Sequence, residues 1–199
     1  MASVEYLIKQ FLTADKKTLD LSNQKLGDKG AVAVSNSKAL RKLKRLSLPN
    51  NNIGDEGIIA IANSEFFKNL TELDIYGNVI GDDGVKAIAE SPYFGKLRKL
   101  SLYGNLVEDD GAIALAESET LVKLKHLYLT GNRIRRDGVD ALKAAKCNAR
   151  LCHLHLDDIE DFIYEDDAED DDDDEVVINS LEDLKKYKEK MAKEGASNG

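Results

Sequence analysis

The three histidines of the sequence, His126, His153 and His155, are the side chains best suited to chemistry near neutral pH. His153 follows His126 by 27 residues, and His155 comes two residues later. On neighbouring parallel strands, His126 and His153 would stand about 4.8 Å apart at the backbone, with His155 on the same side. With Asp157 or Asp158 as a fourth ligand, they could bind a divalent metal such as zinc. The alternative is that they are polar surface residues or contacts to a partner.

No catalytic motif accompanies these histidines. The sequence contains no phosphate-binding loop, no nucleophile elbow and no pair of carboxylates on a defined scaffold. The acidic run from Asp170 to Asp174 lacks the central glycine and the spaced ligands of a calcium-binding EF-hand loop. The two cysteines, Cys147 and Cys152, do not form a disulfide framework. We therefore expect a protein that is not an enzyme and that uses no cofactor.

A period of 27 residues organises the chain. The segment LDIYGNVIGDDG, from Leu73 to Gly84, recurs twice upstream and twice downstream, and a partial copy, LHLDD, begins at Leu154. The other full copies are LDLSNQKLGDKG, LSLPNNNIGDEG, LSLYGNLVEDDG and LYLTGNRIRRDG. Self-similarity at a fixed spacing of this length is typical of repeat proteins.

The pattern LxxLxLxxNxI resembles that of leucine-rich repeats of the ribonuclease-inhibitor-like class, in which each strand is followed by a true helix. The resemblance covers residues 18–156, as five full copies and a partial sixth. It implies an α/β fold, a short curved solenoid with a parallel sheet on the concave face and helices on the convex face. We assign residues 1–17 to an N-terminal capping helix and residues 157–199 to an acidic segment with a C-terminal helix.

Within each repeat, three kinds of residue are expected to build the scaffold. Alternate strand residues, such as Leu100 and Leu102, point into the core. A ladder of amides is expected to bond the backbone of neighbouring coils; it comprises Asn51, Asn78, Asn105 and Asn132, with Gln24 in the first copy. An aspartate at the start of each helix is expected to cap its free N–H groups; these are Asp28, Asp55, Asp82 and Asp109. The fifth copy has Arg136 in this place, so its cap is expected to shift to Asp137.

Both ends of the array are expected to be covered. Residues 3–14 carry one apolar helical stripe, and Ser3 can cap that helix. Residues 157–175 hold fourteen Asp or Glu and no Lys or Arg, so this segment is expected to be solvated. Residues 176–193 are expected to form a C-terminal cap that covers the last coil, with a short strand at 176–178 and a helix that begins at the capping box of Ser180 and Asp183. The alternative for this helix is a partner-binding element on an acidic tether.

The outward positions of the strands form the candidate binding face. Three tyrosines are expected at its centre, and exposed tyrosine beside arginine is typical of interface hot spots. The alternative is that these tyrosines only reflect strand propensity. The predicted partner-binding residues are Arg45, Glu72, Asp74, Tyr76, Lys99, Tyr103, His126, Tyr128, His153 and His155.

These features predict a non-catalytic module that binds another protein on its concave face. An alternative is a regulator of a small GTPase, because Ran GTPase-activating proteins resemble this chain in joining such repeats to an acidic tail. A third interpretation is that the acidic segment inhibits the chain by folding back onto its basic residues. The small net charge of +4 in residues 1–156 argues against nucleic acid. No apolar run is long enough for a membrane span and no signal peptide is evident, so we expect a cytoplasmic monomer without membrane contact.

Overall fold

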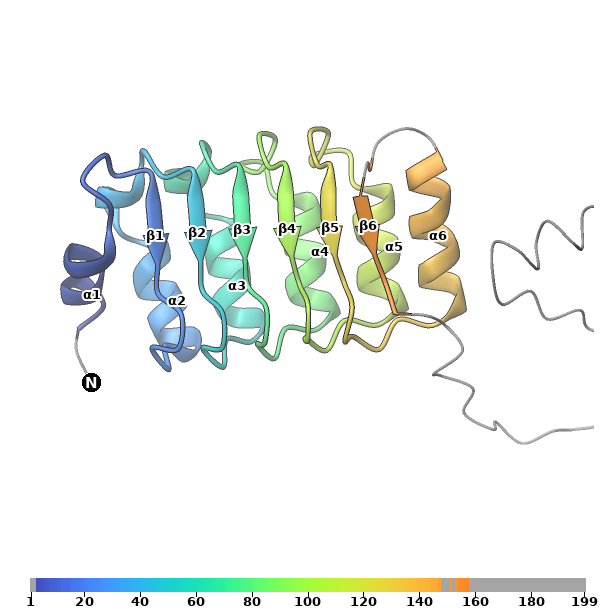
Figure 1. The fold of residues 1–199 in the computed structure, drawn as a ribbon, viewed down its shortest axis with the longest axis horizontal. Helices are drawn as coiled ribbons and strands as arrows, with labels where there is room; N and C mark the ends of the chain where they lie inside the picture. Colours follow the sequence, from blue (N-terminus) through green and yellow to red (C-terminus); the bar gives the residue numbers. More distant parts are fainter. Residues whose placement is uncertain (1–2, 148–150, 152, 158–199) are drawn as a thin grey trace, which may run out of the picture. The chain divides into compact units, whose positions relative to one another are not determined.

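The computed structural model describes residues 3–147, 151 and 153–157 of the 199-residue chain. Within these residues, short strands alternate with helices and form a parallel sheet with the strand order β1-β2-β3-β4-β5-β6 (Figure 1). The strands are β1 (Thr18–Asp20), β2 (Arg45–Ser47), β3 (Glu72–Asp74), β4 (Lys99–Ser101), β5 (His126–Tyr128) and β6 (His153–His155). The helices are α1 (Val4–Phe11), α2 (Gly27–Ser35), α3 (Asp55–Ala62), α4 (Asp82–Glu90), α5 (Asp109–Glu117) and α6 (Arg136–Cys147), with 3-10 turns η1 (Lys38–Leu40) and η2 (Glu65–Phe67).

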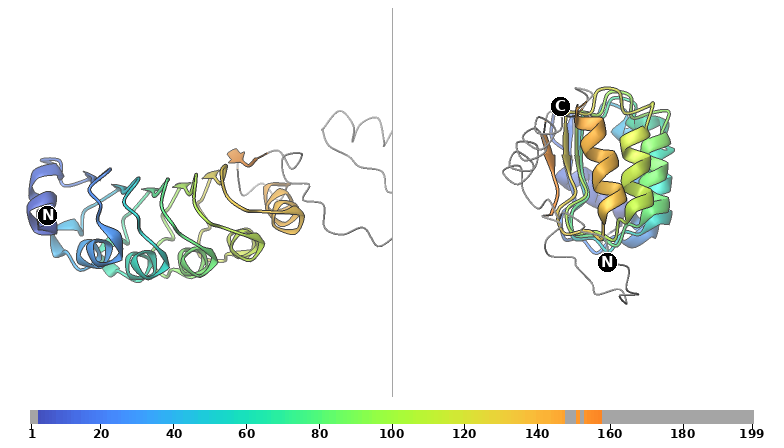
Figure 2. Two further views of the ribbon diagram at one scale, coloured as in Figure 1. Left: turned by 90° about the horizontal axis from the view of Figure 1, so that it is seen from below. Right: turned by 90° about the vertical axis from the view of Figure 1, so that its right-hand side faces the viewer.

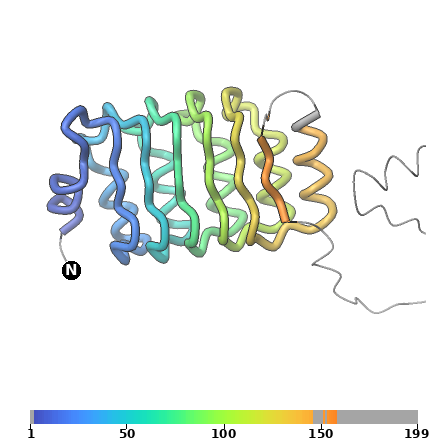
Figure 3. The backbone as a smooth tube through the Cα atoms, viewed as in Figure 1, coloured from blue at the N-terminus to red at the C-terminus, as the bar shows by residue number. Residues whose placement is uncertain are grey.

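The strands pair at a constant offset of 27 residues. Thr18 lies opposite Arg45, Arg45 opposite Glu72, and the same offset continues to His126 and His153. Successive coils therefore lie side by side, as the tube in Figure 3 shows. The sheet lines the inner side of the curve and helices α2 to α6 its outer side (Figure 2, left). The predicted fold, a curved α/β solenoid, is confirmed.

Apolar side chains from every coil fill the space between the sheet and the helices. Leu100 and Leu102 are fully buried, as the alternation of strand faces predicts. Phe67 and Phe94 are also fully buried, where the chain returns from a helix to the next strand. The core is thus continuous from coil to coil, so each repeat is stabilised mainly by its neighbours.

The asparagine ladder lies inside this core, as predicted. Asn78 is 5% exposed, and its Nδ2 donates hydrogen bonds to the carbonyls of Leu48 in the preceding coil and Ile75 in its own. Its Oδ1 accepts hydrogen bonds from the N–H groups of Asn51 and Ile53 in the preceding coil. One side chain therefore satisfies buried backbone groups of two coils at once.

The aspartates cap the helix of the following coil, so the expectation that each caps its own helix is wrong. Asp55 is the first residue of α3, but its Oδ1 accepts hydrogen bonds from the N–H groups of Gly81, at 2.8 Å, and Gly84, at 3.1 Å. These two N–H groups lie at the start of α4. A Cβ atom at Gly84 would lie only 2.6 Å from the same oxygen, which explains the glycine at this position of the repeat.

The same contact recurs along the described coils, and the aspartate that makes it is replaced in α6, the last helix that the structure describes. Asp28 bonds the start of α3, Asp82 the residue before α5, and Asp109 the start of α6. In the last helix, Arg136 occupies the equivalent position. No helix follows α6 among the described residues, so the described array contains no helix that an aspartate at this position would cap.

Helix α1 covers the first coil. The Ser3 hydroxyl accepts a hydrogen bond from the Tyr6 N–H at 3.2 Å, as predicted for the cap, and Leu7 and Ile8 are buried against the core. The helix ends at Phe11 rather than at residue 14, because Leu12 forms an antiparallel bridge with β1. The predicted C-terminal cap, residues 176–193, lies outside the described residues. No helix in the described part of the chain is both long and apolar enough to cross a membrane.

The capping of each helix by the preceding coil can be tested with two aspartates of adjacent coils. Asp55→Ala is expected to lower the free energy of unfolding by about 1–2 kcal/mol, because it removes the cap of α4. Asp83→Ala, an exposed acid in the first turn of α4 itself, is the matched control and is expected to change it by less than about 0.5 kcal/mol. Urea unfolding measures both, and equal effects would contradict capping from the preceding coil.

Candidate functional site

All ten candidate residues occupy outward positions on or just after strands β2 to β6. Eight lie within the strands, and Tyr76 and Tyr103 follow β3 and β4 by two residues. The exposed members are Arg45, Lys99, Tyr103, His153 and His155, and the half-buried members are Glu72, Asp74, Tyr76, His126 and Tyr128. The 27-residue register places equivalent residues directly beside one another. Three groups of contacts result.

The first group joins Tyr76 and Tyr103. Their ring centroids lie 6.3 Å apart with the planes at 63°, an edge-to-face arrangement. Asn50 Nδ2 donates a hydrogen bond to the Tyr76 hydroxyl at 3.3 Å. On the other side, a carbon of the Tyr103 ring lies 3.7 Å from where a Cβ atom of Gly131 would be, and Gly131 has a φ of +73°. The pair is thus held between two neighbouring coils, while Tyr103 remains 51% exposed.

The second group joins Lys99, Tyr128 and His155 on three successive strands. The Tyr128 and His155 rings are stacked, with centroids 4.5 Å apart and planes at 8°. Lys99 Nζ lies 5.3 Å from the centroid of the Tyr128 ring, within the range of a cation–π interaction. These contacts fix the orientation of an ammonium group and two rings before any partner binds.

The third group is the histidine pair His126 and His153. Their rings are stacked, with centroids 4.5 Å apart and planes at 11°, so the ring nitrogens do not converge on a common point. His155 stacks on Tyr128 instead. Among the described residues, no cluster of three or more His, Cys, Asp or Glu is placed to hold a metal ion. The rings in register present their faces to each other, so the three imidazoles are not brought to one point, and the metal site at His126, His153 and His155 stays a prediction.

The imidazole of His126 lies in an environment that disfavours its charged form. Burial, followed by the positive charge of His153 and Lys99, lowers its pKa below the ordinary value of 6.5. Lys125, directly before it in the chain, and His155 act in the same direction. Neutral His126 is thus the form that fits the folded protein.

Charged side chains flank these rings. Arg45 donates hydrogen bonds from Nε and Nη2 to the Thr18 hydroxyl, at 3.2 and 3.0 Å, which fixes it toward β1. Asp74 accepts a hydrogen bond from the Tyr76 N–H at 3.4 Å. No ion pair joins Arg45 or Lys99 to an acid among the described residues. The face therefore presents cations that a partner could pair.

The structure adds two supporting residues that the sequence did not predict, Asn50 and Gly131. Both lie at the position after the strand where the repeat carries positive φ, with Asn50 at +53°. The signal in the sequence is the change at this position from asparagine in the first two copies to glycine in the next three. That change accompanies the tyrosines, and a Cβ atom at Gly77 would collide with the Asn50 side chain that bonds the Tyr76 hydroxyl.

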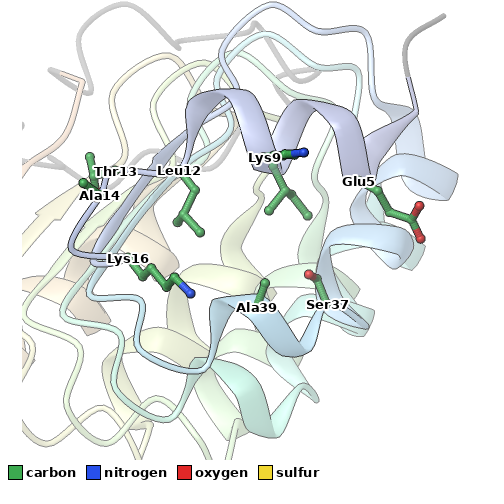
Figure 4. Close-up of a pocket in the computed structure, with 9 residues that line it drawn as sticks. Glu5, Lys9, Leu12, Thr13, Ala14, Lys16, Ser37 and Ala39 are labelled. Atoms are coloured by element: carbon green, nitrogen blue, oxygen red, sulfur yellow. The ribbon is translucent and has the colours of Figure 1, made fainter.

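Two cavities lie away from the candidate face. One of about 440 Å³ lies beside α1, where Ile8 and Leu12 line it together with Lys9 and Lys16 (Figure 4). The other, of about 620 Å³, is lined by residues of α4 and α5 and by the residues that follow α5. Neither is lined by any of the ten candidate residues, so the concave face remains the candidate site.

Comparison with known families identifies the repeats. A family model described as a leucine-rich repeat matches residues 39–62, 68–89, 96–116 and 120–143, which correspond to four successive coils. Fold and motif together define an open solenoid of leucine-rich repeats. The chain is a leucine-rich-repeat protein, and an α-helix follows each of its strands β1 to β5.

Solved structures share this fold at low sequence identity. The actin-binding site 2 of leiomodin-1 is 20% identical, with a TM-score of 0.51, and the match covers 74% of this chain and 90% of that one. The tropomodulin C-terminal domain of Caenorhabditis elegans is 15% identical, with a TM-score of 0.47, and the match covers 75% of this chain and 96% of that domain. An internalin of Listeria monocytogenes is 18% identical, with a TM-score of 0.35, and the match covers 65% of this chain and 47% of the internalin chain. The comparison with curated proteins found no match. At such identities, the likeness shows the fold alone.

The lowered pKa of His126 predicts a pH-dependent stability. Because the unfolded state binds a proton more readily, the contribution of His126 is fully present above pH 6.5 and is lost as the pH falls below that value. His126→Asn is expected to reduce the loss of stability between pH 7.5 and 5.5. Urea unfolding at both pH values measures the difference for each protein. An identical loss in the variant would contradict the prediction.

Proposed function

We propose that this protein is a non-catalytic binding module that holds another protein against its concave face. The observation that carries the proposal is the ordered row of rings on that face. Tyr76 and Tyr103 lie side by side, Tyr128 lies in register with His155, and all three tyrosines remain partly or largely exposed. The core is already continuous beneath them, so the fold has no need of aromatic side chains at these outward positions.

Preordered rings favour binding for an energetic reason. Fixing a flexible side chain at an interface costs about 0.5–1.5 kcal/mol, and stacking against a neighbour has already met part of that cost. Tyr128 is held between His155 and Lys99, and Tyr76 by Asn50. Such side chains combine a large apolar area with a polar tip, which is the composition of interface hot spots.

The charges around the rings indicate the kind of partner surface. Arg45 and Lys99 present cations, while Glu72 and Asp74 present acids on the strand between them. A partner with apolar groups at its centre and mixed charges around them would match this pattern. The similar leiomodin-1 structure, an actin-binding site, supports a protein as the partner class. Its 20% identity does not extend to the choice of partner.

The two alternative functions, regulation of a small GTPase and metal binding, differ in how the structure bears on them. Regulation of a small GTPase stays a prediction, because neither the fold nor the comparisons test it; a GTPase assay would show faster hydrolysis only under that alternative. Metal binding by the three histidines is not proposed, since their rings stack rather than converge.

The concave face can be tested by capture of partners from the native cell extract. We expect the triple variant Tyr76→Ala, Tyr103→Ala, Tyr128→Ala to lower recovery of a partner at least tenfold. This corresponds to a loss of about 1.4 kcal/mol or more of binding free energy. The matched control is Tyr6→Ala, Val122→Ala, which removes two exposed apolar side chains, 58% and 64% exposed, outside the candidate face.

The thermal stability of each protein is measured alongside. If the triple variant is unstable, Tyr103→Ala alone replaces it, because this ring is the most exposed of the three. Recovery of the same proteins, in equal amounts, by the wild type, the tyrosine variants and the control would overturn the concave-face proposal.

A further inference from the structure

Basic and acidic side chains of the repeat array concentrate in different parts of each coil. Five loops lead into strands β1 to β5: residues 13–17, 38–44, 65–71, 92–98 and 119–125. Together they hold eleven Lys or Arg and three Asp or Glu, a net charge of +8. The rest of residues 1–156 holds twelve basic and sixteen acidic side chains, a net charge of −4. The modest overall charge of the array therefore conceals one strongly basic part.

The fold brings these five loops together along one edge of the sheet, which we call the strand-start edge. Lys17, Lys44, Thr71, Arg98 and Lys125 stand directly before the five strands, at equivalent places of the register. Each of the last four donates its backbone N–H to the carbonyl of the one before, at 2.8 to 2.9 Å. Four of five neighbouring backbone positions thus carry a cation, at a spacing of about 4.8 Å.

Three of these four cations form no ion pair within the part of the chain that the structure describes. Lys44, Arg98 and Lys125 are exposed, and none forms an ion pair with another described residue. Only Lys17 has one at this edge of the described chain, with Asp15 at 3.5 Å. Like charges on adjacent strands repel each other, so the row opposes folding slightly and needs another explanation.

We infer that the strand-start edge binds an extended acidic segment of a partner protein. Five loops at about 4.8 Å span roughly 20 Å, which matches about six residues of extended chain. Lysine supplies flexible point charges that can follow carboxylates at irregular spacing. This inference goes beyond the proposed function, because the row before the strands shares no side chain with the concave face.

Single-stranded nucleic acid fits this edge less well. Proteins that bind it combine a basic groove with exposed aromatic side chains on which bases stack. In the part of the chain that the structure describes, the exposed aromatic residues are Tyr6, Phe11 and Tyr103, and none belongs to the five loops. The edge offers charge without stacking surfaces, which favours a carboxylate-rich peptide.

The test uses the full chain and a fluorescein-labelled peptide of ten alternating Glu and Asp residues, followed by fluorescence anisotropy at 50 mM and 300 mM salt. The triple variant Lys44→Glu, Arg98→Glu, Lys125→Glu is expected to bind the peptide at least tenfold more weakly than the wild type at low salt. The matched control is Lys25→Glu, Lys29→Glu, Lys143→Glu, three exposed lysines outside the five loops, with the same change in net charge. Competition from the acidic residues 157–175 is common to all variants.

We expect the control and the triple tyrosine variant to bind the peptide within about threefold of the wild type, and binding to weaken at high salt. Equal losses in the two charge variants would overturn the inference, since they would show an effect of net charge alone. Binding of a ten-nucleotide oligo(dT) more tightly than the peptide would also overturn it, in favour of nucleic acid. If the Lys44, Arg98 and Lys125 variant is unfolded, the triple variant Lys44→Gln, Arg98→Gln, Lys125→Gln replaces it. The control then also carries Gln in place of Glu.

Discussion

A carboxamide buried between consecutive coils is the contact on which this structure depends. Asn105 is 4% exposed, and its Nδ2 donates to the carbonyl of Ile75 in the preceding coil and to that of Leu102 in its own. Its Oδ1 accepts from the N–H of Ile80 in the preceding coil. Loss of the amide would leave these groups buried without partners, at about 1–3 kcal/mol for each. Because one side chain must reach both coils, the spacing between copies is fixed, and no insertion interrupts the 27-residue period.

The aspartate contact adds direction to this coupling. Each carboxylate bonds the start of the next helix, so a coil stabilises the one that follows it. The two ends of the array are chemically different for this reason. At the first end, Gln24 replaces the asparagine and α1 covers the core; in the last helix, Arg136 replaces the aspartate. Gln24 fits a first coil that is preceded by the capping helix α1 and not by another coil.

The sequence predicted those features that follow from periodicity and failed where geometry across coils decides. The columns of outward residues, the buried leucines and the asparagine ladder all follow from a 27-residue offset between parallel strands. The aspartate was assigned to the wrong helix, because capping rules are written for a single helix and do not consider the next coil. The histidines were correctly placed on adjacent strands, yet equal register makes their rings stack, which no spacing rule reveals.

The scaffold and the candidate surfaces use different parts of each repeat. Core leucines and the two polar ladders satisfy the folding requirements from inside, and in the described residues no buried side-chain nitrogen or oxygen lacks a hydrogen bond. Residues that point outward are therefore free to vary from copy to copy, and they do: Arg45, Glu72, Lys99 and His126 occupy one column. Variation in that column contrasts with the row directly before it, where Lys17, Lys44, Arg98 and Lys125 keep one charge. A varied column suits recognition of one particular surface, whereas a uniform row suits attraction of a charge type. The proposal for the concave face and the inference for the strand-start edge thus rest on different residues.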